Sequence, residues 1–402
     1  MTGLPTIELD FTSPPPIPAA GVQRANELLK SGRLFRYGET GVGELDVAEL
    51  EMAFAQLVGR RYCIAFNSCG ASLAASLMAV GVGPGEPVLM NAFTLAPVPG
   101  AIVHAGGDPV FVGITPDYEI DLEHLRTAAQ SSGARVLMLS HMRGHITDMD
   151  RLMEVATDLS LTVIEDCAHT MGAGWSGRPS GTFGAVGCFS TQTFKHVNSG
   201  EGGLLVTDDD NVAAQAILLS GSYMLHAQHG TPPPPEAIER HRYTTPNLSM
   251  RMSALAAAIV RPQLDLLEQR AALWNERFDR LAELLDADPM IRVPPRRAQE
   301  QYVASSIQFS VDGLESSEMT AWLALTEAHG VHVKWFGQPE PIGFTSRYDH
   351  WRYASEQTLH ATATVLQGLC DMRIPLTMSL DDCAVVAEII RGALAVVGRR
   401  SE

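Results

Sequence analysis

Seven short apolar runs recur between residues 62 and 208, and most of them are continuously apolar. Such runs are typical of strands that are buried on both faces of a sheet. Segments with helical spacing, such as residues 72–81 and 149–159, separate several of the runs. This alternation predicts an α/β fold with a mostly parallel, doubly wound sheet covered by helices. The predicted strands are residues 62–66, 87–93, 109–114, 136–141, 161–168, 185–191 and 203–208.

A different pattern follows the last of these strands. Residues 211–221 have helical spacing and lead into residues 226–243, which contain four consecutive prolines. Proline removes a backbone donor and restricts the chain, so this segment is predicted to be a surface excursion or lid. Residues 249–285 are predicted to be helical, with a break near Pro262.

The length of the chain favours two packed units. Its 402 residues exceed the roughly 250–300 residues at which a single hydrophobic core stops growing. After about residue 290, strands at 305–311 and 330–336 and a final helix at 384–397 indicate a smaller α+β unit. We therefore predict a large α/β unit over residues 1–260, which includes an N-terminal arm, and a small unit over residues 261–402.

Ligands of parallel α/β sheets collect beyond the carboxyl ends of the strands. The segments 67–72, 166–169 and 190–195 follow three of the predicted strands, so we expect functional side chains there. Only three of the 29 basic residues are lysines, namely Lys30, Lys195 and Lys334. These three side chains are the candidates for a reactive amine.

The three lysines have different surroundings. Lys30 lies near the end of a polar helix, where it complements the helix dipole, and Lys334 is predicted to be a solvent-facing residue of a strand. Lys195 follows a buried strand and precedes the glycine-rich residues 200–203. A lysine in an apolar crevice has a lowered pKa and can form a Schiff base with a carbonyl compound, so Lys195 is the candidate.

Three further features accompany Lys195. Asp166 ends a strand and could pair with a protonated pyridine nitrogen, although Glu165 or Asp166 could instead cap the next segment. Residues 67–72 offer small side chains and a helix start, which suit a phosphate, but a simple serine N-cap explains them almost as well. Ser190 could add a hydroxyl to the same phosphate.

The motifs Glu-Asp-Cys-Ala-His at 165–169, Phe-Ser at 189–190, Lys195 and Gly-Glu-Gly-Gly at 200–203 resemble those of a known family. This is the sugar aminotransferase (DegT/DnrJ/StrS) family of pyridoxal-phosphate enzymes. The resemblance extends from residues 32–39 to residues 372–390, nearly the whole chain. It implies the fold-type I architecture, with a seven-stranded α/β domain and a smaller C-terminal domain.

The resemblance also implies roles for individual residues. Lys195 corresponds to the Schiff-base lysine, Asp166 to the partner of the pyridine nitrogen, and His169 to the residue beside the ring. The phosphate-binding positions correspond to Gly70, Ala71 and Ser190. Leu95 stands where the family usually has an aromatic ring over the cofactor, and Ser249 stands where it usually has the asparagine of Asn-x-Arg. Asn247 could substitute for that asparagine.

Three hypotheses for the function follow. The first is an aminotransferase that uses pyridoxal 5′-phosphate to move an amino group from glutamate or glutamine to a keto-sugar, often nucleotide-linked, or a keto-cyclitol, in antibiotic or polysaccharide synthesis. The second is a dehydratase or aromatising synthase of the aminohydroxybenzoate-synthase type. The third is a non-catalytic regulator that keeps the fold. The resemblance implies a homodimer with shared active sites, and residues 249–259 are the expected subunit contact.

Composition narrows the range of partners. The formal net charge of −17 argues against nucleic acid or an anionic membrane as the main partner. No run of about 18 or more apolar residues predicts a membrane span, and the first residues do not resemble a signal peptide. The six cysteines form no C-x-x-C pair, so we predict free reduced thiols and a cytoplasmic location.

No metal site is predicted. His141 and His145 have a helical i, i+4 spacing, but Gly144 and the preceding strand argue against a helical metal pair. His226 and His229 lie beside the prolines and are predicted to be solvated loop residues.

Overall fold

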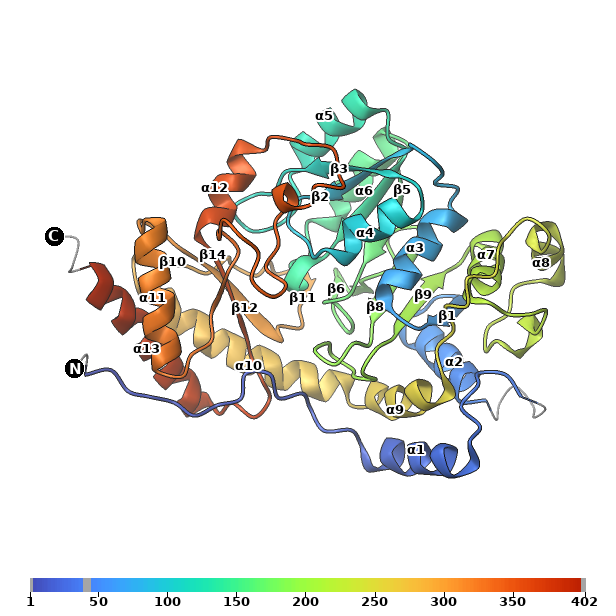
Figure 1. The fold of residues 1–402 in the computed structure, drawn as a ribbon, viewed down its shortest axis with the longest axis horizontal. Helices are drawn as coiled ribbons and strands as arrows, with labels where there is room; N and C mark the ends of the chain where they lie inside the picture. Colours follow the sequence, from blue (N-terminus) through green and yellow to red (C-terminus); the bar gives the residue numbers. More distant parts are fainter. Residues whose placement is uncertain (1–2, 39–44, 399–402) are drawn as a thin grey trace.

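A seven-stranded sheet forms the centre of the molecule (Figure 1). The computed structural model describes residues 3–38 and 45–398, so Glu39, the last residue of the segment 32–39, lies outside the described residues. Each strand agrees within two residues with a predicted run, which confirms the α/β fold. In spatial order the strands are β1 (Tyr62–Phe66), β9 (Gly203–Thr207), β8 (Val186–Ser190), β5 (Thr162–Asp166), β4 (Val136–Ser140), β2 (Pro87–Asn91) and β3 (Asp108–Val112).

The direction of the strands decides where their ends meet. β9 is antiparallel to both of its neighbours, and all other pairs within the sheet are parallel. The carboxyl ends of β1, β8, β5 and β4 therefore lie at one edge. The three segments expected to carry function, residues 67–72, 166–169 and 190–195, all begin at this edge.

Helices cover both faces of the sheet (Figure 1). Successive side chains of a strand point to opposite faces, and within β2 Leu89 packs into one core cluster while Val88 and Met90 pack into another. The face with Met90 is covered by α3 (Cys69–Ala79), α4 (Pro97–His104) and α7 (Asp210–Ser220). The opposite face is covered by α2 (Asp46–Val58), α5 (Leu122–Ser132), α6 (Met149–Asp158) and α9 (Ala254–Leu264).

The C-terminal part forms its own antiparallel sheet. Its strands, in spatial order, are β10 (Ile291–Arg292), β12 (Ser306–Val311), β14 (Leu369–Arg373) and β13 (Lys334–Trp335). The predicted strand at 330–336 is thus shorter than expected. The helices of this part are α10 (Leu267–Leu285), α11 (Ser316–Ala328), α12 (His360–Gly368) and α13 (Leu380–Gly398). A third small sheet joins β11 (Glu300–Gln301), β6 (Gly174–Trp175) and β7 (Arg178–Pro179).

The two parts share one hydrophobic core. Leu137 of the large sheet belongs to the same buried cluster as Ile307 and Trp322 of the small unit. The N-terminal arm, which we assigned to the large unit, packs on the small one, where the N–H of Ile7 donates to the carbonyl of His329 over 3.0 Å. The predicted domain boundary between residues 260 and 261 falls inside α9, and the division at that point stays a prediction.

Two helix predictions need refinement. Pro262 lies inside α9, and the break comes at Asp265 and Leu266, before α10. The excursion at 226–243 includes the 3-10 turn η3 (His226–Gln228) and a short helix, α8 (Pro235–His241), because proline is tolerated in the first turn of a helix. Two further 3-10 turns are η2 (Met142–Gly144) and η4 (Tyr348–His350).

The prediction of a solvated His229 was wrong. Its ring is fully buried and contacts Glu51 of α2, Arg36 and Tyr37. Arg36 pairs with Glu51 over 3.0 Å, with both side chains inaccessible to solvent. This buried network attaches the start of the excursion at 226–243 to α2. Helix α9 packs against both α2 and α1 (Ala19–Ser31).

Two other expectations concern thiols and membranes. All six cysteines are free, and every one except the partly exposed Cys69 is buried. Across residues 3–38 and 45–398, no helix combines the length and the apolar character needed to cross a bilayer.

Candidate active site

Lys195 and His169 form the centre of the site. Lys195 lies in the turn after β8, and its Nζ is 2.7 Å from Nε2 of His169. Burial lowers the pKa of Lys195 to about 8; the charge of Arg143 lowers it further, and Asp166 opposes these effects. Burial, followed by the charge of Lys195, lowers the pKa of His169 well below its usual value. His169 is therefore neutral, and its Nε2 accepts a hydrogen bond from the Lys195 ammonium group.

Asp166 is held by hydrogen bonds at the end of β5. Its Oδ2 accepts from the Ser140 hydroxyl over 2.7 Å, and its Oδ1 accepts from the N–H of Ala168 over 3.1 Å. The Thr94 hydroxyl donates in turn to Ser140 over 2.8 Å. The carboxylate, 4 % exposed, is thus oriented by neighbouring strands at the same edge of the sheet as Lys195.

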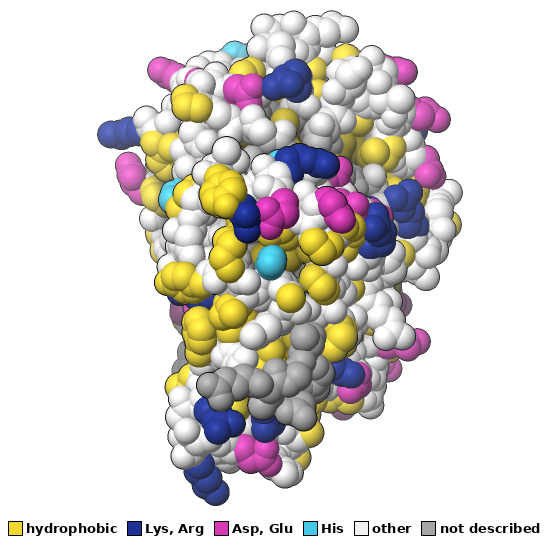
Figure 2. All heavy atoms as spheres, turned by 90° about the vertical axis from the view of Figure 1, so that its right-hand side faces the viewer, with side chains coloured by type: hydrophobic (Ala, Val, Ile, Leu, Met, Phe, Trp, Pro, Cys, Tyr) yellow, Lys and Arg dark blue, Asp and Glu magenta, His cyan; other side chains and the backbone are white. Residues whose placement is uncertain are grey.

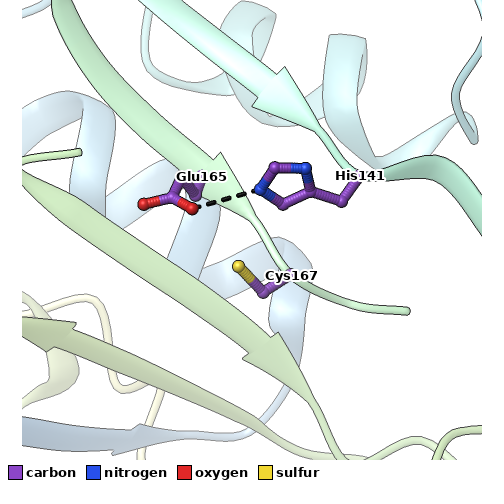
Figure 3. Close-up of side chains that lie close together, drawn as sticks. All are labelled: His141, Glu165 and Cys167. Carbon is purple, nitrogen blue, oxygen red and sulfur yellow. Dashed lines mark hydrogen bonds and ion pairs between the residues drawn. The ribbon is translucent and has the colours of Figure 1, made fainter. Parts of the chain in front are cut away.

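The adjacent Glu165 has a different function in the fold. Its carboxylate accepts from the N–H groups of Gly181, Phe183 and Gly184 and lies 3.1 Å from Nε2 of His141 (Figure 3). Burial alone would raise the pKa of Glu165, but these hydrogen bonds lower it. Neighbouring strand residues point to opposite faces, so Glu165 anchors a loop while Asp166 remains at the site.

His141, Glu165 and Cys167 bring their possible ligand atoms within 4.8 Å of one another (Figure 3). Burial raises the pKa of Cys167 well above its usual value, so its sulfur carries a proton. The Glu165 oxygens are already occupied by four donors. His145, which forms the i, i+4 pair with His141 in the sequence, contacts Gln308 instead, with 2.9 Å between its Nε2 and the Gln308 Oε1. Glu165 and His141 form a hydrogen-bonded anchor with Cys167 beside them, and we propose no metal there.

The segment 67–72 forms the start of α3. Ser68 is the N-cap residue, and its hydroxyl accepts from the N–H of Ala71 over 3.0 Å, so that N–H is already engaged. Gly70 lies in the first helical turn, with only Ser68 Oγ and Pro97 Cβ near the place that a Cβ would take, at 3.9 and 4.0 Å. Ser190 ends β8, and its Oγ accepts from the N–H of Gln192 over 3.3 Å.

Gly203 allows the close approach between α3 and β9. A Cβ at this position would lie 2.6 Å from the nitrogen of Cys69 and would also collide with the carbonyl of Ser68. Gly203 therefore lets the N-terminal end of α3 lie at the edge of the sheet that carries Lys195. This helix end offers backbone N–H groups and the positive end of the helix dipole.

The remaining predicted residues lie farther out. Leu95 is partly buried and packs against the core cluster beneath α3 and α4. Asn247 and Ser249 are exposed, and the Asn247 Oδ1 accepts from the N–H of Ser249 over 3.1 Å. The nearby N–H of Asn67 donates to the carbonyl of Met250 over 2.9 Å. Asn247 and Ser249 contact neither Lys195 nor Asp166 through any hydrogen bond of the described residues.

Sequence reasoning missed a group of charges beside the site. Arg143, Lys334 and Arg373 surround the buried Asp371, and the expectation of a solvent-facing Lys334 was wrong, because this lysine is partly buried and lies 3.7 Å from Asp371. Arg143 follows β4 at the functional edge of the sheet, so its position was a usable signal. Arg373 and Lys334 come from another sheet, and no local pattern places them there.

Comparisons with known proteins identify the family of this chain. The DegT/DnrJ/EryC1/StrS aminotransferase family matches residues 17–391, and the chain belongs to this family. It is 32 % identical over 227 residues to GDP-perosamine synthase from Caulobacter vibrioides, covering 56 % of this chain and 58 % of that protein. It is 35 % identical over 239 residues to L-glutamine:scyllo-inosose aminotransferase from Streptomyces griseus, covering 58 % and 55 %. The chain thus spans somewhat more than half the length of these two relatives.

The fold has close counterparts among solved structures. That of 3-amino-5-hydroxybenzoic acid synthase superposes with a TM-score of 0.81 at 23 % identity and covers 96 % of this chain and 99 % of its own. At this identity the likeness shows the fold alone. Membership in the family indicates pyridoxal 5′-phosphate as the cofactor, as the sequence predicted. The residues fit this group, since a buried amine, an oriented carboxylate and a helix start meet at one edge of the sheet.

Proposed function

We propose that this protein is a pyridoxal-phosphate-dependent aminotransferase that acts on a keto-sugar or keto-cyclitol. One observation carries the proposal. The buried Lys195 amine lies 2.7 Å from the ring of His169, beside the strand end where Asp166 is held by Ser140. An amine of lowered pKa beside an oriented carboxylate suits a carbonyl cofactor with a pyridine ring.

In this proposal each predicted residue has one function. Lys195 would hold the cofactor aldehyde, and Asp166 would pair with the protonated ring nitrogen. His169 and Leu95 would pack beside the ring, Leu95 by aliphatic contact. Phosphate would be bound by the N–H of Gly70 and the hydroxyl of Ser190, with Ala71 contributing shape because Ser68 already accepts from its N–H. Asn247 and Ser249 would reach the phosphate of the cofactor that is bound in a partner subunit.

The bound cofactor supplies an electron sink for the carbanion that forms when an amino acid loses its α-proton. Once neutral, the Lys195 amine accepts that proton at Nζ and can deliver it to a neighbouring carbon. His169 accepts a hydrogen bond from Nζ and keeps the amine directed toward the site. Asp166 is oriented by its hydrogen bonds to Ser140 and Ala168, and it would favour the protonated form of the pyridine ring.

The names of two relatives support a proposal for the donor and the acceptor. One relative is named an L-glutamine:scyllo-inosose aminotransferase and another a GDP-perosamine synthase. We infer glutamate or glutamine as the amino donor and a keto-cyclitol or a keto-sugar, often nucleotide-linked, as the acceptor. A cytoplasmic role in antibiotic or surface-polysaccharide synthesis is consistent with such substrates.

A second candidate is an aromatising dehydration of the aminohydroxybenzoate-synthase type. A 3-amino-5-hydroxybenzoate synthase from Amycolatopsis mediterranei is 29 % identical over 260 residues. That reaction would use the same Lys195. The two candidates differ in the donor half-reaction, because only a transaminase takes an amino group from glutamate or glutamine onto its cofactor. A non-catalytic regulator would not need Lys195, His169 and Asp166 to be brought together.

We also propose a homodimer with shared active sites. The predicted contact at 249–259 stays a prediction; its residues Met252, Ala254, Ala257 and Ala258 are buried within the chain, where α9 packs on α1 and α2. Apolar side chains gather on the face that carries α7 and α8 (Figure 2). Large exposed apolar residues of the neighbouring segments are Phe35, Tyr223, Met224, Tyr243 and Leu248. Because exposed apolar patches mark interaction surfaces, this face is the proposed subunit contact.

Absorbance of the loaded protein tests the function. L-glutamine or L-glutamate should convert the bound aldehyde to the amine form and remove the visible Schiff-base absorbance, and Lys195→Ala should abolish both absorbance and conversion. Lys30→Ala, in the last turn of α1, is the matched control and should behave as the unmodified protein. Conversion by Lys195→Ala would contradict the assignment of the amine. Dehydration without any donor conversion would favour the second candidate.

A further inference from the structure

Three cations converge on one aromatic ring, that of Phe344. The ring centroid of Phe344 lies 4.3 Å from Nζ of Lys334, 5.6 Å from Cζ of Arg143 and 5.4 Å from Cζ of Arg373. A cation over an aromatic face is attracted by the ring quadrupole. Phe344 is 40 % exposed, so the ring forms the outer cover of the cluster.

One carboxylate pairs with these cations within the part of the chain that the structure describes. Asp371, fully buried, lies 3.0 Å from Nη2 of Arg143 and 3.7 Å from Nζ of Lys334. Its Oδ1 also accepts from Nε2 of Gln308 over 2.7 Å. Arg373 has no ion pair among residues 3–38 and 45–398; it stacks instead on Phe194, with its Cζ 3.7 Å from the ring centroid.

The cluster therefore carries more positive than negative charge in a poorly solvated place. Arg143 is 7 % exposed. Its Nη2 has the ion pair with Asp371, but its Nε and the Nη1 of Arg373 are buried without a hydrogen-bond partner among the described residues. Burying a cation without compensation is costly, so such a group is expected to meet an anion. Burial lowers the pKa of Lys334 to about 8 and that of Arg373 to about 10; the charge of Arg143 lowers both further, and Asp371 opposes these effects.

The cluster adjoins the reacting amine. Lys195 and Arg373 line one cavity of about 40 Å³, together with Ser305 and the N-terminal arm at Pro14. The charges of Arg143 and Arg373 both act on Lys195 and on His169. An anion bound by the cluster would thus lie within one small molecule's length of Nζ of Lys195.

We propose that Arg143, Lys334 and Arg373 form a carboxylate-binding subsite for the substrate. The proposal rests on the proposed aminotransferase function and adds to it the recognition of an acid group. Two guanidinium forks suit the planar, two-oxygen geometry of a carboxylate. Because the cluster lies near Lys195, the carboxylate that it binds should be close to the reacting atoms. A carboxylate on the carbon that carries the amino group meets this condition. The carboxylate belongs either to the amino donor or to an acidic acceptor.

Asp371 and its partners position the cluster. A neutral His145, whose pKa burial lowers to about 3, donates from Nε2 to the Gln308 carbonyl oxygen over 2.9 Å, and Gln308 donates to Asp371. Asp371 then holds Arg143 and Lys334, and Arg373 has no ion pair with any residue that the structure describes. Arg373 is accordingly the residue from which the largest effect on carboxylate binding is expected.

Binding of glutarate, a dicarboxylate without an amine, tests the subsite without turnover. Calorimetric titration of the cofactor-loaded protein should give a Kd that rises at least about tenfold in Arg373→Gln and in Lys334→Gln. Arg373→Lys should recover part of the loss. Arg126→Gln, which removes an exposed ion pair with Asp158, is the control and should leave the Kd unchanged. An unchanged Kd in both cluster variants, or equal competition by inorganic phosphate, would overturn the proposal.

The two half-reactions then identify the source of the carboxylate. A higher half-saturating concentration of L-glutamine or L-glutamate in Arg373→Gln, with the acceptor step unaffected, assigns the subsite to the donor. The converse result, with an acidic acceptor, assigns it to the acceptor. If neither half-reaction changes in folded variants, the subsite proposal fails although the transaminase stands. If the unmodified protein shows no half-reaction, the proposed aminotransferase function is wrong. The glutarate titration then still tests whether the cluster binds a carboxylate.

Discussion

Nζ of Lys195 lies 2.7 Å from Nε2 of His169. Each of the two groups affects the other. The charge of Lys195 helps to keep His169 neutral, and the neutral imidazole accepts a hydrogen bond that orients the amine. Because burial lowers the pKa of Lys195 to about 8, a fraction of the amine is neutral at physiological pH and can act as a nucleophile and as a proton carrier.

The first prediction concerns the pH dependence of cofactor loading. Lys195 attacks an aldehyde only when it is neutral, and burial lowers its pKa to about 8. The rate of Schiff-base formation by the apoprotein should rise about tenfold between about pH 7 and pH 9 and then level off. Stopped-flow absorbance measures this rate, with Nα-acetyl-lysine as the comparison. A rate that continues to rise beyond pH 9, as for the free lysine, would show that the amine is not perturbed.

The second prediction concerns the hydroxyl that holds Asp166. Ser140→Ala removes the 2.7 Å donor to Oδ2, and hydrogen bonds to charged groups contribute about 1.5–3 kcal/mol. The Kd for pyridoxal 5′-phosphate should therefore rise at least about tenfold in an equilibrium titration. Ser131→Ala, on the exposed face of α5, should leave the Kd unchanged. Equal affinity of both variants would mean that Asp166 needs no support from Ser140.

The third prediction concerns the contact between α3 and β9. In Gly203→Ala the new Cβ would lie 2.6 Å from the nitrogen of Cys69, so the helix start must shift. Overpacking of this kind costs about 1–3 kcal/mol of unfolding free energy, and the affinity for inorganic phosphate as a competitor of the cofactor should fall. Urea unfolding and competition titration measure the two effects. Gly83→Ala, with nothing within 4 Å, is the control, and similar behaviour of the two variants would contradict the packing argument.

The fourth prediction concerns the buried network of α2. Glu51→Gln removes the negative charge opposite Arg36 and His229. A buried cation that loses its partner costs about 3–5 kcal/mol of unfolding free energy. Glu49→Gln, an exposed change on the same helix, should have little effect in urea unfolding. A loss of less than about 1 kcal/mol in Glu51→Gln would show that the charge is not needed.

The same network makes the stability depend on pH. Burial alone would raise the pKa of Glu51, but Arg36 and His229 lower it from 4.5 to about 2. A carboxylate with a lowered pKa contributes its full stability above the unfolded value and loses it as the pH falls toward the folded value. The difference in unfolding free energy between the unmodified protein and Glu51→Gln should therefore shrink between about pH 4.5 and pH 2.

Local patterns were sufficient for the sheet and for part of the site. Continuous apolar runs placed all seven strands, and their carboxyl ends placed Asp166, Ser190 and Lys195 at one edge. The same reasoning could not separate Glu165 from Asp166, because both are acidic residues at a strand end. Hydrogen bonds from residues 181–184 and the Ser140 hydroxyl, all distant in sequence, make one an anchor and leave the other at the site.

The sequence by itself determined the α/β fold and the family and singled out the candidate lysine, because period, strand length and compact motifs are local properties of the chain. The tertiary structure decided what surrounds Lys195. Arg143, Lys334 and Arg373 come from segments up to 230 positions apart in the sequence, and their charges meet around Asp371 only after two sheets pack together. Burial of His229 and the exposure of Asn247 depend likewise on which surfaces cover them. Long-range packing sets desolvation and charge pairing, and no pattern along the chain encodes either.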